Sequence, residues 1–431
     1  MRRKITKMSL ALVLSFALLL SGMVVNAQSD SLLDELNREA DQLLIDVLGY
    51  DFIQNHNRAV ENAGVIRSSI QRTGFNDIYG GSYIDDNGNL VLLIVEADGV
   101  RSDMVEMFEV AYDYMGISVR AVKYSYDDLV RVFQDISMIL SNEFNSRIRS
   151  NVSSLYVDVF DNRVVVTLRE YNQEYVDLFK DTIVDLPMVM LKACTLGNIS
   201  WGANYLPSEV EDYMTEFSGP IIGRTTLVQG ERLYVNGVSR GSVGYGAIRN
   251  RDNMRGFVTH GHFLRVGDEI SVRRSGSLVR VGIVELQRWG TDSTPPAHNR
   301  APHRFDASFV RLIDSDIHTV GHTRLPIYGE VVRTRGTPPF IITPTVVSND
   351  SRIRALRYEL NPVGSRVTAD VIWTNHISGA RLSSGMSGGP VEFTSDSGIA
   401  GVHVAGGGND GFFSRDDEIR HWNSGFDLRL R

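Results

Sequence analysis

The residue pattern of this chain changes near Phe217, and the change divides its 431 residues into two bodies of different build. In the first body, apolar residues at helical spacing alternate with short strand-like runs, which predicts an α+β fold. From Leu227 onward, short β-rich runs are separated by Gly, Asn, Pro and Arg-Asp turns, and no long helical period remains. About a dozen such runs predict an all-β barrel or sandwich. Just over 200 residues are enough for two small barrels with separate cores.

The net charge divides at the same place. Residues 28–217 carry a formal charge of −18 and residues 218–431 a charge of +6, while residues 1–27 add +4 to give the total of −8. Opposite charges favour docking of one body on the other, because complementarity aids encounter and register. A basic cleft in the second body would also attract acidic peptides, an effect that salt weakens. We expect no nucleic-acid partner.

The amino terminus has the pattern of a secretory signal peptide. Basic residues in Met1–Lys7 precede an apolar stretch, Met8–Leu20, and Val25–Ala27 forms a small-x-small cleavage site before Gln28. The apolar stretch is too short for a permanent membrane helix, although an uncleaved amino-terminal anchor is the alternative. We therefore predict a signal peptide over residues 1–27, a secreted protein, and no membrane anchor after signal removal.

The first body shows a repeated α+β pattern and no catalytic motif. Residues 80–98 predict a hairpin around Asn87-Gly88, since Asn-Gly suits a tight turn, and residues 155–184 repeat the order strand, turn, strand, helix. The single cysteine, Cys194, excludes intramolecular disulfides and cysteine-based zinc sites. We expect it to be a small core residue.

Three short sequences in the second body carry the residues of nucleophilic catalysis. Gly256–His262 ends an apolar strand in a turn with histidine, Phe305–Val310 begins an apolar strand with aspartate, and Gly385–Val391 places a serine in a glycine-rich turn. A serine hydroxyl becomes a good nucleophile when an imidazole takes its proton, and a carboxylate fixes the tautomer of that imidazole. The order His, Asp, Ser therefore predicts acyl transfer, with the backbone N–H groups of Gly385 and Ser387 facing a developing oxyanion.

These motifs resemble those of the chymotrypsin-like serine proteases, in particular the secreted bacterial streptogrisin and α-lytic protease group. The family sequence GFVTAGHC is matched by Gly256–Phe263 and GDSGGPV by Gly385–Val391, and the resemblance extends from about Thr226 to the carboxyl end. It implies two six-stranded antiparallel β-barrels with the active site between them, and no metal or organic cofactor. By this resemblance the catalytic residues are the general base His262, the orienting carboxylate Asp306 and the nucleophile Ser387.

The first body resembles the propeptide of the same group, most closely over Gly80–Val95. The resemblance implies an intramolecular folding catalyst and inhibitor that is cut off. We expect cleavage between Glu216 and Val228, with the enzyme itself as one candidate for the cutting protease. The predicted domains are a signal peptide (1–27), an acidic α+β propeptide (28–217) and a chymotrypsin-like serine protease domain (218–431).

The sequence departs from the family at three positions. Phe263 stands where many relatives have a disulfide cysteine, and His260 replaces a small residue. Met386 replaces the aspartate that pairs with a new amino terminus in animal relatives. That ion pair cannot form here, so removal of the propeptide is the expected route of activation.

Two of these features have a second interpretation. His260 and His262 lie at alternate positions and would face one side of a strand, but a third ligand at suitable spacing is missing, so we favour catalysis over a metal site. Asp292 is the other candidate for the orienting carboxylate. It lies in a Thr-Asp-Ser-Thr-Pro-Pro loop, where aspartate usually forms turn hydrogen bonds. We favour Asp306 because it leads an apolar strand that can hold it rigidly.

The resemblance also indicates which residues select the substrate. Arg381 stands where an aspartate gives trypsin-like cleavage, so we do not expect that specificity. His403 matches a carboxylate-binding histidine of glutamate-specific relatives, and Ser384 matches a pocket serine of the same enzymes. An imidazole, a hydroxyl and a nearby guanidinium would recognise a carboxylate. The alternative is that His403 is a core histidine and Arg381 a surface residue. The matched substrate-binding strand also contains Ala405 and Gly406.

Together these features predict a secreted bacterial serine endopeptidase that is made as a zymogen with a propeptide. It would hydrolyse peptide bonds through an acyl-enzyme, with a preference for glutamate before the scissile bond. Its expected partners are a peptide or protein substrate and its own propeptide. The alternative is a catalytically inactive binding protein that keeps the protease fold, suggested by Met386 and His260 at unusual places.

Overall fold

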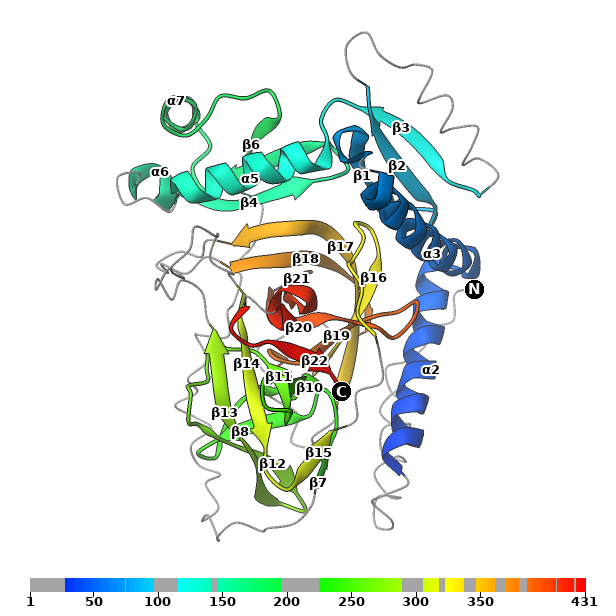
Figure 1. The fold of residues 1–431 in the computed structure, drawn as a ribbon, viewed down its shortest axis with the longest axis vertical. Helices are drawn as coiled ribbons and strands as arrows, with labels where there is room; N and C mark the ends of the chain where they lie inside the picture. The colour runs from blue at the N-terminus through cyan, green and yellow to red at the C-terminus, as the bar shows by residue number, and fades with distance from the viewer. Residues whose placement is uncertain are drawn as a thin grey trace, which may run out of the picture. The chain divides into compact units, whose positions relative to one another are not determined.

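The computed structural model in Figure 1 describes residues 28–73, 75–96, 115–140, 146–194, 225–288, 305–317, 322–336, 346–360, 369–379, 386–407, 409–421 and 424–431. The chain forms two compact units, Met1–Leu43 and Leu44–Arg431. The described part of the first unit is helical and belongs to α2 (Gln28–Leu48). The predicted signal peptide and the predicted domain boundary after residue 217 lie outside the described residues. None of the helices in these ranges is long and apolar enough to cross a membrane.

A helix and a three-stranded sheet form the first lobe of the amino-terminal body. Its elements are α3 (Tyr50–Thr73), η1 (Phe75–Ile78), β1 (Tyr79–Ile84), β2 (Leu90–Val95) and β3 (Ser118–Val122). β1 and β2 form the antiparallel hairpin that the sequence predicts, and β3 runs parallel to β2. At the hairpin turn, the Asp85 carboxylate accepts the N–H groups of Asn87 (2.9 Å) and Asn89 (2.8 Å). These side-chain bonds add to two backbone bonds of the turn, from the Asp85 N–H to the Asn89 carbonyl (2.9 Å) and from the Gly88 N–H to the Asp85 carbonyl (3.1 Å).

The second lobe repeats this arrangement of strands. Its elements are α5 (Tyr126–Leu140), α6 (Ser146–Asn151), β4 (Val152–Asp158), β5 (Arg163–Leu168), α7 (Gln173–Thr182) and β6 (Val189–Ala193). β4 and β5 are antiparallel and β6 is parallel to β5, as in the first lobe, which agrees with the expected duplication of an α+β unit. Cys194, expected in the core, is only partly buried after β6, where its thiol donates to the Ser153 hydroxyl (3.1 Å).

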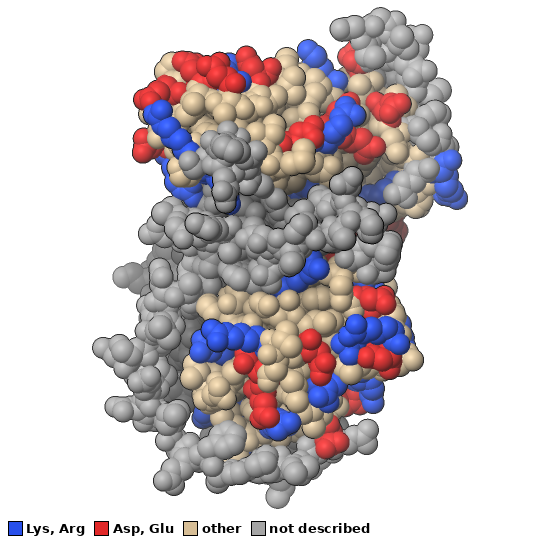
Figure 2. Space-filling model, turned by 60° about the vertical axis from the view of Figure 1, so that its left-hand side comes forward, with Lys and Arg blue, Asp and Glu red and all other residues tan. Residues whose placement is uncertain are grey.

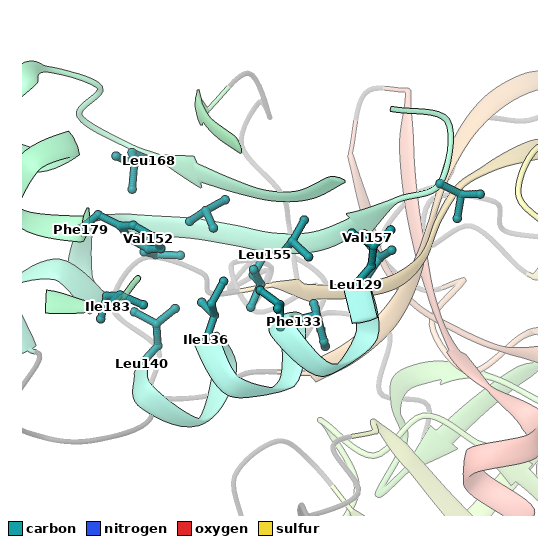
Figure 3. Packing of buried hydrophobic residues seen from close by; sticks show 14 of the residues in the cluster. Leu129, Phe133, Ile136, Leu140, Val152, Leu155, Val157, Leu168, Phe179 and Ile183 are labelled. Atoms are coloured by element: carbon teal, nitrogen blue, oxygen red, sulfur yellow. The ribbon is translucent and has the colours of Figure 1, made fainter. Parts of the chain in front are cut away.

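The core of the second lobe lies between α5 and the sheet (Figure 3). Apolar residues recur every three or four positions along one side of α5, so that a single face of the helix is buried. Figure 3 shows this face directed toward the side chains of β4 and β5. The labelled core residues are Leu129, Phe133, Ile136, Leu140, Val152, Leu155, Val157, Leu168, Phe179 and Ile183.

Acidic side chains gather on the second lobe. Figure 2 shows them at the top of the view, where α5, α6 and α7 lie in Figure 1, whereas basic and acidic side chains mix on the lower part. The distribution follows the charge division of the sequence. The exposed acids of α7 and the turn after it are Glu174, Asp177, Asp181 and Asp185.

The first part of the carboxyl-terminal body is an eight-stranded sheet in the order β22-β10-β11-β14-β13-β12-β8-β9. The pairing of its two end strands, β22 and β9, with each other is not seen in the described ranges, so the predicted first six-stranded barrel is not closed there. The physical reason is that the edge of β10 is already paired with another strand. β22 covers the free edge of β10, and at the end of β9 the Ser242 N–H donates to the Ser387 carbonyl (2.8 Å). The strands are β8 (Arg232–Val235), β9 (Val238–Ser242), β10 (Tyr245–Arg249), β11 (Met254–Thr259), β12 (Glu269–Arg274), β13 (Ser277–Arg288), β14 (Ala307–Leu312) and β22 (Leu428–Leu430), beside the parallel pair β7 (Thr225–Leu227) and β15 (Ser315–Ile317).

The second part is a closed barrel of six strands, which confirms the prediction for one of the two barrels. The strand order is β16-β19-β20-β21-β18-β17, and β17 pairs again with β16. Two ion pairs are buried in its wall, Arg333 with Asp350 (2.7 Å) and Arg335 with Glu392 (2.8 Å). The elements are β16 (Val331–Gly336), β17 (Val347–Leu360), β18 (Ala369–Gly379), β19 (Pro390–Phe393), β20 (Ile399–Gly407) and β21 (Asp410–Arg415), followed by α8 (Asp416–Arg420).

One sheet joins this barrel to the second lobe. The far end of β17 pairs antiparallel with β4, with Tyr358 opposite Tyr156, so that β4, β5 and β6 extend the barrel sheet to nine strands. The rings of Tyr156 and Tyr358 stack with centroids 5.3 Å apart, and both contact Trp373. The join therefore has a backbone ladder and an aromatic core.

Candidate active site

Strand pairing brings the histidine and aspartate motifs together. β11 and β14 are antiparallel neighbours, with Thr259 opposite Ser308. The chain that leaves β11 therefore runs beside the chain that enters β14. This register places the turn that contains His262 next to Asp306, although 44 residues separate them in sequence.

Asp306 is fully buried, and its N–H and both carboxylate oxygens are engaged. One carboxylate oxygen is hydrogen-bonded to Nδ1 of His262, and the other accepts the N–H of Gly261 (2.5 Å). The Asp306 N–H donates to the hydroxyl of Ser414 on β21 (2.9 Å), which ties β14 to the barrel. The bond to Nδ1 selects the imidazole tautomer whose Nε2 can accept a proton.

Ser387 lies in a tight turn that enters β19. Its side chain is buried, and its hydroxyl donates to the Val404 carbonyl (3.3 Å). Backbone bonds hold the turn on both sides, because Gly388 donates to the His403 carbonyl (2.7 Å) and His403 donates to the Gly389 carbonyl (2.9 Å). Gly388 has φ +87°, and a Cβ there would lie 2.1 Å from Oγ1 of Thr259. Only glycine fits this position.

His260 connects the two halves of the site. Its ring centroid is 4.3 Å from that of His262, and its Nε2 contacts the Arg240 carbonyl. A Cβ placed on Gly241 would touch both Nε2 of His260 (2.4 Å) and the Ser387 carbonyl (2.5 Å), so these two groups are near neighbours. Burial, with a smaller contribution from His262, holds the pKa of His260 well below its usual range. His260 is therefore a neutral packing element between His262 and the Ser387 turn.

The alternative metal interpretation of His260 and His262 can be compared with the geometry. Across the described ranges, no group of three or more His, Cys, Asp or Glu side chains is arranged to hold a metal ion. The Nε2 of His260 is already engaged with a carbonyl. Asp292, the other candidate carboxylate, lies outside the described residues.

The specificity residues are only partly described. His403 lies in β20 with Ala405 and Gly406, and it is buried. Burial, and to a lesser extent the neighbouring His262, lowers the pKa of His403 to about 3. At neutral pH its side chain is an uncharged N–H donor rather than a cation. Three further predicted residues lie outside the described residues, namely Arg381, Ser384 and the oxyanion-hole residue Gly385.

Two contacts of the site have no sequence signal. Ser414 supports Asp306 from a strand that follows it by 108 residues, and Val404 accepts the Ser387 hydroxyl from a neighbouring strand. Both belong to the barrel wall, and each is an ordinary strand residue when the sequence alone is considered. Only the closed barrel, which brings β20 and β21 beside the site, reveals their positions.

Comparison with known families identifies both lobes of the amino-terminal body. Residues 27–110 match the family described as the Pro-like N-terminal domain, and residues 127–191 match the Pro-like C-terminal domain. These matches confirm the predicted resemblance to a propeptide. They also agree with the two lobes seen in the structure.

Several solved structures similar to this chain are described as proteases or protease domains. Nocardiopsis protease (NAPase) is 21% identical with a TM-score of 0.34, covering 48% of this chain and 100% of its own. The Rv3671c protease of M. tuberculosis in its inactive form is 18% identical with a TM-score of 0.31, covering 45% and 87%. The MamO protease domain of Magnetospirillum magneticum is 14% identical with a TM-score of 0.31, covering 45% and 95%. Comparison with curated proteins finds no match.

Proposed function

We propose that this chain, whose first body carries the two Pro-like domains, is the secreted precursor of a serine endopeptidase. The observation that carries the proposal is the pair of His262 and Asp306, whose side chains are almost fully buried. His260 packs against His262 and also lies against the glycine-rich turn of Ser387. Both carboxylate oxygens are occupied, so the imidazole has one orientation and one tautomer. Such an arrangement is suited to general-base catalysis.

The chemistry would proceed in two stages. Nε2 of His262 takes the proton of the Ser387 hydroxyl while Oγ attacks the substrate carbonyl carbon, so the hydroxyl must leave its bond to Val404. The N–H groups of Gly385 and Ser387 stabilise the tetrahedral oxyanion. His262 then gives the proton to the leaving amine, and the acyl-enzyme remains. Water, activated by the same imidazole, releases the acid product.

Reaction with an active-serine reagent tests this function directly. A fluorophosphonate forms an adduct with a serine that a neighbouring base activates, so we expect a single adduct on the peptide that contains Ser387. The adduct should be absent from Ser387→Ala and present in the matched control Ser239→Ala, a change at an exposed serine of β9. The reagent is added to the processed protein, because the proposed inhibitor would block the site in the precursor. A processed and folded wild-type protein that takes up no reagent would instead support the non-catalytic binding protein.

We further propose that the first body is an inhibitor that cleavage between Glu216 and Val228 removes. The pairing of β4 with β17 and the join around Tyr156 and Tyr358 support a body that binds the protease body tightly. The opposite charges of the two bodies favour the same docking.

A preference for glutamate before the scissile bond belongs to the same proposal. His403 lies near His262, since the two influence each other electrostatically, and its neutral side chain can donate an N–H to a substrate carboxylate. His403→Leu keeps a similar volume and removes the donor. We expect kcat/KM for a Glu-linked reporter peptide to fall by about 10- to 100-fold, because a hydrogen bond to a charged group is lost.

Reporter peptides with Ala and Phe in place of Glu provide the comparison for this prediction. Their kcat/KM should change much less in His403→Leu, and His421→Leu, at an exposed histidine after α8, should leave all three values unchanged. Equal cleavage of the Glu, Ala and Phe reporters by the wild-type enzyme would contradict the preference.

A further inference from the structure

The first lobe docks on the segment that leads into β16, residues 322–331. The Ile84 N–H donates to the Tyr328 carbonyl (2.8 Å), and Tyr83 and Tyr328 form a single parallel β-bridge at the edge of β1. Ile327 inserts into the apolar core of the lobe. The approach is close, because a Cβ on Gly329 would lie 2.1 Å from the Ile84 carbonyl oxygen. We call this contact the lobe interface.

Arg352 of β17 forms hydrogen bonds to both sides of the lobe interface. Its guanidinium donates to the Gly329 carbonyl (2.9 Å) on its own side and to the Ile84 carbonyl (3.0 Å) on the lobe. It also bonds to the Asp85 carbonyl and to the Asp86 carboxylate (2.6 Å). The positive charge is therefore satisfied mainly by carbonyl dipoles and by one exposed carboxylate.

His56 of α3 lies at the centre of the lobe interface and is 1% exposed. Its Nε2 accepts the backbone N–H of Val331 at 3.0 Å, and its Nδ1 lies 3.3 Å from the side-chain oxygen of Asn57. A backbone N–H can only donate, so Nε2 must carry a lone pair. The docked lobe therefore requires a neutral imidazole. A proton on Nε2 would oppose two donors and break the bond to Val331.

Two arginines near His56 oppose its protonation, whereas Asp396 favours it. Arg352 approaches from β17 and Arg324 from the segment before β16, and Asp396, from the turn between β19 and β20, is bound to Arg324 (2.7 Å). Glu330 is buried and also pairs with Arg324. Burial is the main cause that lowers the pKa of His56 to about 4. The hydrogen bond to Asn57 and the charge of Asp396 act in the opposite direction, and the two arginines lower the pKa further.

We propose that His56 is a proton sensor that makes docking of the first Pro-like lobe dependent on pH, with the neutral imidazole holding the lobe and acid releasing it. The contacts carry this proposal independently of the hydrolytic chemistry. Its consequence, an inhibitor that acid loosens, rests on the proposed function.

The direction and size of the effect follow from proton linkage. The docked pKa of about 4 lies below the ordinary value of 6.5, so the undocked lobe binds more protons. Docking is fully supported above pH 6.5 and weakens as the pH falls from 6.5 toward 4. From pH 7.5 to pH 5 the docking constant should fall by about 30-fold.

The neighbouring carboxyl groups do not reproduce this behaviour. Burial raises the pKa of Glu330, so its protonation in mild acid favours the docked state. Burial raises the pKa of Asp396, but its bonds to Arg324 and Gly398 together outweigh that effect and lower the pKa overall, so Asp396 titrates below this pH window. A loss of docking between pH 6.5 and 5 therefore points to His56.

Hydrogen exchange on the full-length chain tests the proposal. Ser387→Ala is used as the background so that the chain stays intact, and the Ile84 amide reports docking through its bond to Tyr328. We compare His56 with His56→Gln, whose side-chain oxygen can accept the Val331 N–H but does not titrate. At each pH we take the ratio of the Ile84 exchange rates in the two chains, because the intrinsic exchange rate is the same in both and cancels. Between pH 7.5 and 5 the protection of Ile84 should fall about 30-fold more with His56 than with Gln.

The matched control is His421→Gln, which makes the same substitution at an exposed position after α8 and should behave like the His56 chain. Equal protection of the His56 and His56→Gln chains at pH 5 would overturn the proposal. If His56→Gln itself prevents docking at pH 7.5, the test uses the His56 chain alone. The deciding quantity is then the slope of the logarithm of Ile84 protection against pH. Uptake of one proton per undocking event between pH 6.5 and 5 supports the sensor, and a slope of zero refutes it. Exchange is measured on an inactive chain, so failure of the serine chemistry would leave the result unchanged.

Discussion

Replacing Ser387 with alanine is expected to lower kcat for peptide hydrolysis by about 10⁶-fold, because no acyl-enzyme can form without Oγ. The same change should leave an uncut precursor in the medium if the enzyme processes itself. The measurement is the turnover of a reporter peptide by purified protein, together with the mass of the secreted chain. Stability should change little, because Oγ makes only a long bond of 3.3 Å to the Val404 carbonyl.

Ser239→Ala, at an exposed serine of β9, is the matched control and should retain full activity and normal processing. Hydrolysis that persists in Ser387→Ala at the wild-type rate would exclude Ser387 as the nucleophile. Normal processing of Ser387→Ala with loss of its own hydrolytic activity would instead identify another protease as the processing enzyme.

Asp306→Asn is expected to lower kcat by about 10⁴-fold, with a much smaller change in KM. The asparagine oxygen can still accept the Gly261 N–H, but its NH₂ group then faces Nδ1 of His262. Nδ1 must become an acceptor, so the proton moves to Nε2, the atom that has to receive the Ser387 proton. The separation of kcat from KM distinguishes this tautomer effect from a loss of substrate binding.

A suitable control is Asp268→Asn, where the carboxylate accepts the Arg265 N–H in a surface turn and an amide oxygen can do the same. We expect wild-type kinetics for this variant. An Asp306→Asn protein that is folded and fully active would show that another group orients His262, and would return attention to Asp292.

Local features of the fold could be predicted from the sequence. The hairpin of β1 and β2 follows from alternating apolar runs on either side of an Asn-Gly turn, and the structure confirms it. The nearness of His262 and Asp306 follows from motifs at the ends of two strands, and the antiparallel register of β11 and β14 accounts for it. Both features depend on short sequence motifs that can be recognised without knowing the rest of the fold.

Features that depend on distant pairing could not be predicted. The edge of β10 is covered by β22, which comes from the end of the chain, and the first sheet does not close into a barrel in the described ranges. The bond from Val331 to His56 spans 275 residues, and on its helix His56 is one of many polar residues in an amphipathic pattern. Neither Val331 nor His56 stands out in its local sequence, because each is required only by its contact with the other in the folded chain.

The pairing of β4 with β17 also determines what is left behind when the first body departs. In the intact chain, the edge of β17 from Tyr358 to Leu360 is covered by Ser154–Tyr156 of β4. Removal of the first body would expose one bare strand edge on each product, and a bare edge can recruit any other strand, including that of a second copy. We therefore expect the first body to limit self-association as well, and the concentration of released protein at which aggregates begin to form measures how much it contributes.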